Sequence, residues 1–380
     1  MNMKKEVSTV KQKPFFHPTF GSRPAQIVGR DQIIEQFLEG LYEPIGSRNR
    51  CTFLIGQRGM GKTALLLELA DLARENDMIP AVVTAYKGMN EEIIETIQRN
   101  AAQILTKNGR QVQGFEVGAF GFSFGLTLSG ANAGQAGFRP KHALLCDEME
   151  KYNKGILLLV DETTNSDEVR QLGITYQHMI GENKNIAIVM AGLPQAVSSV
   201  LNDKVLTFLN RAEKVNLGPI SLAEIKAYYV LAFRKEEIQI SEDLLNEAVA
   251  ATEGYPYLMQ LIGYYLLRFA GTEKTVKPIT VRRAIEAARH DMEENVFTPL
   301  LAPLSDTDLL FLKAMAVDGR RGSQMADIGA RTGKNNSYLQ PYRARLISAG
   351  IIEAPKKGKV CFTMPYLAEY LQKEVDEAFD

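Results

Sequence analysis

One eight-residue segment, residues 56–63, constrains the fold of this chain more than any other part of its sequence. The segment is GQRGMGKT, and it lies between an apolar run, CTFLI, and a leucine-rich run with helical spacing, ALLLELA. Glycine lets a loop wrap until its N–H groups point inward, and a helix that follows adds the positive end of its dipole. We therefore expect a loop that binds phosphate groups, placed between a buried strand and a helix.

The same segment matches the pattern G-x-x-x-x-G-K-[ST], in which the polar side chains have defined chemical roles. Lys62 is expected to reach the β- and γ-phosphates of ATP and to act in catalysis, and the Thr63 hydroxyl is expected to bind Mg²⁺. The predicted cofactors are therefore ATP and Mg²⁺. The residues expected to line the triphosphate are Gly56, Gln57, Arg58, Gly59, Met60, Gly61, Lys62, Thr63 and Ala64.

A second motif, ILLLVDE at residues 156–162, ends a predicted buried strand with two carboxylates. An ATPase with a phosphate loop needs an acidic residue at the end of a neighbouring strand to hold Mg²⁺, and a group that orients the attacking water. Asp161 fits the first role, and Glu162 fits the second as a general base. The alternative interpretation is two solvated acids after a core strand.

The alternation of strand and helix patterns predicts an α/β fold, with a parallel sheet covered by helices on both faces. We expect an N-terminal arm at residues 1–22, a nucleotide-binding domain at 23–218, a helical lid at 219–299 and a third domain at 300–380. Within the second of these, residues 109–140 alternate apolar and small residues with frequent glycine. That stretch indicates either a glycine-rich β-hairpin insertion or a flexible low-complexity loop.

The composition excludes several classes of protein. The net charge is −1, and the 3 cysteines and 4 histidines have no spacing that would assemble a zinc site. The N-terminus lacks the apolar core of an export signal, and no run approaches the roughly 18 to 20 apolar residues that a membrane span requires. These features predict a reduced, cytoplasmic protein without a membrane partner.

The two motifs and their order resemble the AAA+ ATPases, most closely the origin-recognition-like branch, over most of the chain. The segment IVGRD resembles the box that packs on adenine in that family, which implies that Val28, Gly29 and Arg30 contact the base. Arg211 lies where the family places an arginine finger, often directed at a neighbouring subunit's γ-phosphate, and this implies a homo-oligomer on ATP binding. An arginine at a helix C-terminus is also favourable to the helix dipole, which is the alternative.

The predicted lid and the fourth predicted strand depart from the pattern of that branch. The segment EGYPYLMQ carries Gly254 and Pro256, as in the signal-transduction ATPases with numerous domains, whose GxP turn contacts the nucleotide. No sensor arginine accompanies that turn, and the strand ending IVMAGLP has no Asn or Thr where a polar sensor usually monitors the γ-phosphate. We therefore expect ATP hydrolysis to be slow, as suits a nucleotide-controlled switch.

The C-terminal domain has a local excess of positive charge. Three short helical patterns and a hairpin turning at Lys357 and Gly358 resemble a winged helix-turn-helix. Between residues 320 and 359 there are two acidic residues, Asp327 and Glu353, and nine basic ones: Arg320, Arg321, Arg331, Lys334, Arg343, Arg345, Lys356, Lys357 and Lys359. The resemblance implies that Arg343 and Arg345 contact the major groove or phosphates of double-stranded DNA, and that Lys356, Lys357 and Lys359 lie on the wing.

Pro341 complicates the third of these helices, because proline is comfortable only in a first helical turn. We expect the helix to begin near Gln340, with residues 335–339 as its lead-in, and with Leu339, Tyr342 and Leu346 facing inward. The predicted function is an ATPase that couples its nucleotide state to DNA binding. The alternative is a nucleotide-gated switch whose C-terminal domain binds protein or closes over the ATPase.

Overall fold

The structure is a computed structural model, and it describes residues 15–18, 24–107, 115–118, 121–124 and 137–377. The chain divides into two compact units, which are described separately. Unit 1 comprises Met1–Gly29 and Ile220–Asp291, and unit 2 comprises Arg30–Pro219 and Met292–Asp380. In the described part of the chain, no helix is long and apolar enough to span a bilayer.

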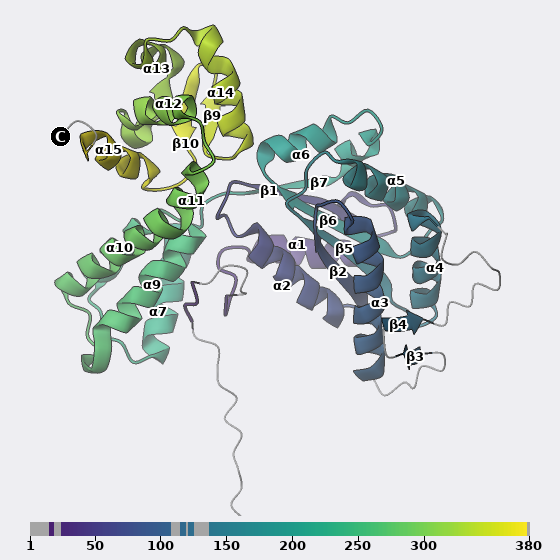
Figure 1. Ribbon diagram of the computed structural model, residues 1–380. Coiled ribbons are helices and arrows are strands. Elements are labelled where there is room, and N and C mark those ends of the chain that lie inside the picture. The colour runs from purple at the N-terminus through teal and green to yellow at the C-terminus, as the bar shows by residue number, and fades with distance from the viewer. Residues whose placement is uncertain (1–14, 19–23, 108–114, 119–120, 125–136, 378–380) are drawn as a thin grey trace, which may run out of the picture. The chain divides into compact units, whose positions relative to one another are not determined.

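Unit 2 contains a five-stranded sheet in which every neighbouring pair of strands is parallel (Figure 1). Its order is β2-β5-β6-β1-β7, so the carboxyl ends of all the strands lie at one edge. The strands are β1 (Cys51–Gly56), β2 (Met78–Thr84), β5 (Gly155–Asp161), β6 (Ile186–Gly192) and β7 (Glu213–Leu217). The predicted parallel α/β fold is therefore confirmed.

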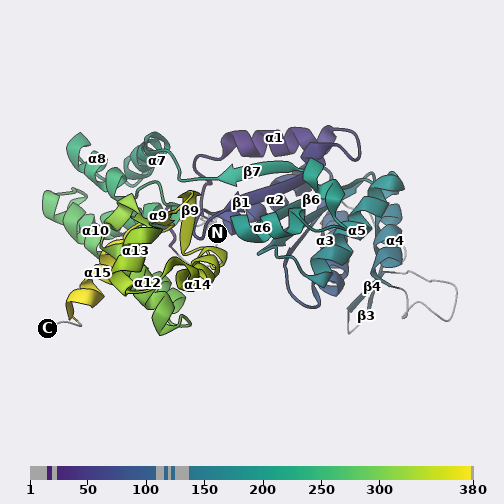
Figure 2. The same cartoon turned by 90° about the horizontal axis from the view of Figure 1, so that it is seen from above.

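Helices cover both faces of this sheet, and alternate residues of each strand serve the two sides. Ile156, Leu158 and Val160 of β5 belong to a core shared with the four helices α3 to α6, whereas the intervening Leu157 and Leu159 are buried on the other side. The helices of the first group are α3 (Met89–Lys107), α4 (Phe138–Glu150), α5 (Asp167–Gly181) and α6 (Pro194–Leu201). The opposite face carries α1 (Asp31–Tyr42) and α2 (Lys62–Glu75), and Figure 2 shows α1 and α5 on opposite sides of the sheet.

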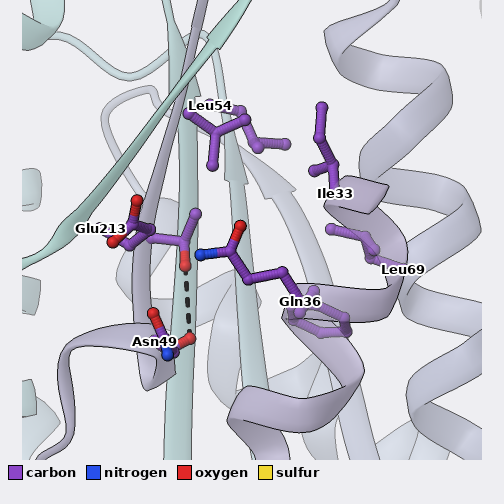
Figure 3. Close-up of a pocket in the computed structure, with 9 residues that line it drawn as sticks. Ile33, Gln36, Asn49, Leu54, Leu69 and Glu213 are labelled. Atoms are coloured by element: carbon purple, nitrogen blue, oxygen red, sulfur yellow. Dashed lines mark hydrogen bonds between the residues drawn. The ribbon is translucent and has the colours of Figure 1, made fainter. Parts of the chain in front are cut away.

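The packing of α1 on the sheet leaves a small apolar hollow (Figure 3). Ile33 of α1 and Leu69 of α2 face Leu54 of β1 across it, and the Thr52 hydroxyl donates to the Asn49 carbonyl at its rim, at 3.3 Å. The hollow is lined by residues of α1, β1, α2 and β7 and of the turn before β1.

The glycine-rich insertion contains a paired hairpin. Strand β3 (Phe115–Gly118) pairs antiparallel with β4 (Gly121–Phe124), as the hairpin interpretation requires. The remainder of the predicted insertion, residues 109–114, 119–120 and 125–136, lies outside the described residues, and Phe138 already begins α4.

The C-terminal part of unit 2 combines short helices with a three-stranded antiparallel sheet of order β8-β10-β9. The hairpin expected at Lys357 and Gly358 joins β9 (Ile352–Lys356) to β10 (Lys359–Phe362). Strand β8 (Ser323–Gln324) was not predicted, because two residues carry no periodic signal. The helices are α11 (Thr298–Leu301), α12 (Asp306–Ala316), α13 (Met325–Thr332), α14 (Asn336–Ser348) and α15 (Leu367–Glu377).

The expected start of α14 was wrong. The helix begins at Asn336 and passes through Pro341, and the Asn335 side chain caps it by accepting the Tyr338 N–H at 2.8 Å. The bond that Pro341 cannot donate would go to the carbonyl of exposed Ser337, which water can reach. Leu339 and Leu346 are buried as expected, whereas the Tyr342 ring is partly exposed beneath the Arg345 guanidinium.

Unit 1 is helical. Ser221 forms a capping box with Glu224 at the start of α7, and the Ser241 side chain caps α8. The described residues of the N-terminal arm pack on this unit: Phe16 is buried against Tyr229 and Phe233 of α7. The helices are α7 (Leu222–Lys235), α8 (Glu242–Ala251), α9 (Pro256–Ala270) and α10 (Pro278–Met292).

Candidate functional site

The phosphate loop of unit 2 connects β1 to α2 with the conformation that its glycines permit. Gly59 and Gly61 have φ values of +74° and +81°, in the left-handed region that disfavours other residues. The Lys62 side chain is buried, and its ammonium group donates to the carbonyls of Gly56 at 2.9 Å and Gln57 at 3.0 Å. Burial lowers the pKa of Lys62, while Glu162 and Asp161 act against that shift. The lysine therefore lies folded over the loop that a triphosphate would enter.

The two motifs meet at a hydroxyl and a carboxylate. The Thr63 hydroxyl of α2 donates to Asp161 Oδ2 at the end of β5, at 2.5 Å, and Asp161 Oδ1 accepts the Glu162 N–H at 2.8 Å. Both groups are hard oxygen donors, which suit Mg²⁺. Among the described residues, no group of three or more His, Cys, Asp or Glu side chains could hold a metal ion by itself. Mg²⁺ usually takes one or two carboxylates together with water and substrate phosphates, so Thr63 and Asp161 are groups that could hold it.

Glu162, the predicted general base, has an unusual backbone. Its φ is +49°, which is strained for a residue other than glycine, and its side chain is exposed to solvent. The strained residue directly follows Asp161, the carboxylate that accepts from Thr63.

The end of β6, where the sequence has no polar sensor, leaves little room for a side chain at Gly192. The Thr163 N–H donates to the Ala191 carbonyl at 2.8 Å, which draws the segment after β5 against the end of β6. A Cβ atom added at Gly192 would lie 2.8 Å from the Thr163 carbonyl oxygen. The sequence provides no signal for this contact.

Arg211 does not end an α-helix as expected. It ends a separate 3₁₀ helix, Thr207–Arg211, which follows α6, and the burial of Leu206 and Leu209 beside it anchors this turn. The Arg211 side chain is exposed. Its role as an arginine finger stays a prediction.

Gly29, predicted to contact the base, and Gly254, predicted to contact the nucleotide, both approach Ile220 in unit 1. A Cβ atom at Gly29 would lie 2.8 Å from Ile220, and the Ile220 N–H donates to the Gly254 carbonyl, also at 2.8 Å. Val28 is buried beside them, and Pro256 is the first residue of α9. Arg30 belongs to unit 2, where its guanidinium donates to the Gly218 carbonyl at 2.6 Å.

Two residues of the phosphate loop contact the C-terminal part of unit 2. Arg58 Nε donates to the Ala349 carbonyl at 3.0 Å, and Gln57 Nε2 donates to Glu353 Oε2 at 3.3 Å. The phosphate-binding motif predicted Gln57 and Arg58 as contacts of the nucleotide alone. No local pattern could indicate these partners, which are 291 or more residues away in the chain.

The basic residues of the C-terminal part are not equally available to a partner. Three of the nine between residues 320 and 359 pair with acids outside that segment: Arg320 with Glu369, Arg331 with Asp318, and Arg345 with Asp308. Lys356 and Lys357 are exposed at the hairpin and make no ion pair within the described part of the chain. Lys359 and Arg343 are partly buried, and Arg343 Nε has no hydrogen-bond partner among the described residues.

A parallel sheet with a glycine-rich loop between β1 and α2, and an acidic residue at the end of β5, defines a P-loop nucleotide triphosphatase. Residues 26–214 match the AAA ATPase domain family, and the chain belongs to the AAA+ ATPases. Residues 294–371 match a domain of unknown function, DUF8462. A search of curated proteins found no match.

Solved structures support the same fold. The chain is similar to the Walker-type ATPase PABY2304 of Pyrococcus abyssi, with 17% identity and a TM-score of 0.66, over 92% of this chain and 97% of the other. It is also similar to the ORC2 protein of Aeropyrum pernix in ADPNP–ADP complexes, with 14% identity and a TM-score of 0.59, over 95% of this chain and 96% of the other. These likenesses show that the chain shares the fold of these two proteins.

Proposed function

We propose that this protein binds ATP with Mg²⁺, hydrolyses it slowly, and uses its nucleotide state to control DNA binding by its C-terminal part. The observation that carries the nucleotide half of this proposal is the Thr63–Asp161 contact, which joins the two motifs at one point. Lys62 would leave the carbonyls of Gly56 and Gln57 to bind phosphate oxygens. Bound Mg²⁺ would supply charge neutralisation at the phosphates, held by Thr63 and Asp161.

Hydrolysis would depend on Glu162, which is exposed at the end of β5 and can orient a water molecule and accept its proton. The lack of a polar sensor at Gly192 supports slow turnover, because no side chain there can position the γ-phosphate. Arg211 is proposed to complete the site of a neighbouring subunit, which makes ATP-dependent assembly part of the proposal.

The ATPase half is tested by two substitutions, one that should remove ATP binding and one that should keep it. Lys62→Ala should abolish ATP binding, whereas Glu162→Gln should bind ATP within about threefold of wild type and hydrolyse it about 100-fold more slowly. Glu168→Gln, on the neighbouring helix α5, is the matched control and should change neither. An unaffected rate for Glu162→Gln would remove Glu162 as the general base.

The DNA half rests on the arrangement of the C-terminal elements. A helix, a short strand, two helices and a two-stranded hairpin follow one another, as a winged helix requires. Lys356 and Lys357 are exposed at the end of the hairpin, and Lys359 pairs with Lys356 next to the turn. Lys356→Glu combined with Lys357→Glu should weaken binding to duplex DNA and reduce its salt dependence. The DNA half of the proposal is wrong if the wild-type protein does not bind duplex DNA and its ATPase rate does not change when DNA is added.

A second function is favoured by two observations. Three arginines of the basic segment are bound to acids, and the phosphate loop contacts Ala349 and Glu353. Both suit a nucleotide-gated switch whose C-terminal part binds protein. The mass in solution with ATP, measured with and without duplex DNA, separates the two proposals: a DNA-dependent complex supports the first. ATP-dependent assembly that Arg211→Ala prevents would support the action of Arg211 between subunits.

A further inference from the structure

A short segment after α14, residues 349–353, lies against the phosphate loop within unit 2, and we name it the docking turn. Its Ala349 carbonyl accepts from Arg58, and its Glu353 carboxylate accepts from Gln57. Both loop residues occupy variable positions of the phosphate-binding motif, between Gly56 and Gly59. The loop predicted to hold phosphates is therefore also a contact surface for the C-terminal part.

The end of α14 explains why Ala349 attracts a cation. Gly350 has a φ of +69°, and its N–H and that of Ile351 donate back to Ile347 and Leu346, at 2.9 and 3.1 Å. These bonds close the helix and leave the Ala349 carbonyl to accept from outside it. Carbonyl groups at a helix C-terminus carry partial negative charge, so a guanidinium group is favoured there.

The docking turn also contacts the end of β6. A Cβ atom added at Gly350 would lie 3.0 Å from Leu193 Cδ2 and 3.5 Å from Gln57 Oε1. Leu193 directly follows β6, which lies between β5 and β1 in the sheet. A glycine is required at this position for its left-handed backbone and for this close approach.

We propose that the docking turn holds the C-terminal part on the phosphate loop when no nucleotide is bound, and that ATP phosphates compete with the Ala349 carbonyl for Arg58. This inference rests on the nucleotide binding of the proposed function, and it does not depend on DNA. A guanidinium group binds a charged phosphate more strongly than a neutral carbonyl. ATP therefore loosens the docking turn, and by thermodynamic reciprocity the docked turn weakens ATP binding.

The test uses two glycines with matched backbones. Gly350 and Gly333 both follow a helix of the C-terminal part, with φ values of +69° and +65°, but a Cβ atom at Gly333 meets no atom within 4 Å. Asparagine tolerates the left-handed region, so each Gly→Asn change adds similar strain without changing charge. Gly350→Asn should therefore bind a non-hydrolysable ATP analogue about 3- to 10-fold more tightly than wild type. Gly333→Asn should bind it as wild type does.

Hydrogen exchange on the wild-type chain gives a second readout that needs no substitution. Adding the ATP analogue should speed amide exchange at residues 346–356, which the proposal places outside the nucleotide site, and should leave α13 unchanged. The proposal about the docking turn is wrong if amide exchange at residues 346–356 stays constant while the analogue binds and both asparagine variants bind the analogue with equal affinity. A wild-type protein that binds no ATP analogue would contradict the proposed function as well. A wild-type protein that binds the analogue but no DNA would contradict only the DNA half of the proposed function.

Discussion

The guanidinium of Arg345 closes over the carboxylate of Asp308, with Nη2 2.6 Å from Oδ2 and Nε 3.1 Å from Oδ1. Asp308 is 1% exposed and also accepts from the Ser305 hydroxyl, in the capping box that begins α12. Burial alone would raise the pKa of Asp308, but the hydrogen bonds from Ser305 and Arg345 outweigh it and hold that pKa below its usual value. Arg345 therefore stabilises the C-terminal fold, whatever it contacts elsewhere.

Arg345→Ala should lower the free energy of unfolding of the C-terminal part by about 1 to 2 kcal/mol, because it leaves a buried carboxylate without its cation. Denaturant unfolding measures this loss. Arg343→Ala removes a nearby arginine of α14 that makes no ion pair within the described residues, and should change stability by less than about 0.5 kcal/mol. Equal losses in the two variants would contradict the structural role of Arg345.

Asp161→Asn should remove the Mg²⁺ dependence of ATP binding. The proposed function makes the Asp161 carboxylate, which accepts from Thr63, the charged ligand for the metal, and without Mg²⁺ this charge would repel the phosphates. ATP affinity should therefore fall about 10-fold in the presence of Mg²⁺ and stay equal or rise in EDTA. Isothermal titration in both buffers measures this. Asp167→Asn, whose side chain is 93% exposed, is the control and should keep the wild-type response to Mg²⁺.

Glu162→Gly should make the protein more stable while it stops hydrolysis. A left-handed backbone strains glutamate by about 1 kcal/mol, and glycine removes most of that strain at some cost in unfolded-chain entropy. We expect the free energy of unfolding to rise by about 0.5 kcal/mol. Glu162→Gln keeps the strain and should leave stability unchanged. A Glu162→Gly variant less stable than Glu162→Gln would show that the backbone is not strained at this position.

The stability of unit 2 should fall with acid through His142. This histidine of α4 is fully buried, neither ring nitrogen has a hydrogen-bond partner among the described residues, and burial lowers its pKa from 6.5 to about 4. The folded state keeps the ring neutral while the unfolded chain protonates it, so the stability is complete above pH 6.5 and falls as the pH drops towards 4. The loss at pH 4 amounts to about 3 kcal/mol.

Replacing His142 with leucine should flatten this dependence between pH 6.5 and 4, as measured by denaturant unfolding at each pH. His178→Gln, at an exposed site in the last turn of α5, should keep the wild-type slope. An unchanged slope in His142→Leu would assign the acid sensitivity to other groups.

Phe16→Ala should destabilise unit 1 by about 3 kcal/mol, because the ring is 3% exposed and occupies the space beside Gly263 that a side chain would fill. Thermal unfolding measures the loss. Phe15→Ala is the natural control, since its ring is only half-buried, and its effect should be about 1 kcal/mol. Comparable effects at both positions would mean that Phe16 is not the anchor of this segment.

Local sequence patterns were sufficient to predict the phosphate loop and the strand and helix that flank it. The motif chemistry requires a metal ligand near Thr63, so Asp161 could be placed beside it from residue types alone. The order β2-β5-β6-β1-β7 could not be predicted in this way, because strand pairing is set by contacts between distant segments.

Contacts between distant segments also explain where the predictions for the C-terminal part differ from the structure. The charge count covered residues 320–359, and the acids that neutralise Arg320, Arg331 and Arg345 lie outside it. The start of α14 was misplaced because the rule for proline is local, whereas the burial of Leu339 and Leu346 against the rest of the fold holds the helix together.

The anchoring of Phe16 also determines when unit 1 can form during synthesis. The His17 N–H donates to Gln260 Oε1, across 243 residues of chain, and Phe16 lies beside Gly263 on the same helix. Chains generally fold from the N-terminus as they emerge, so the sheet of unit 2 can be complete while Phe16 and His17 still lack the helix on which they pack. These two residues thus wait for a partner that is made after the whole sheet.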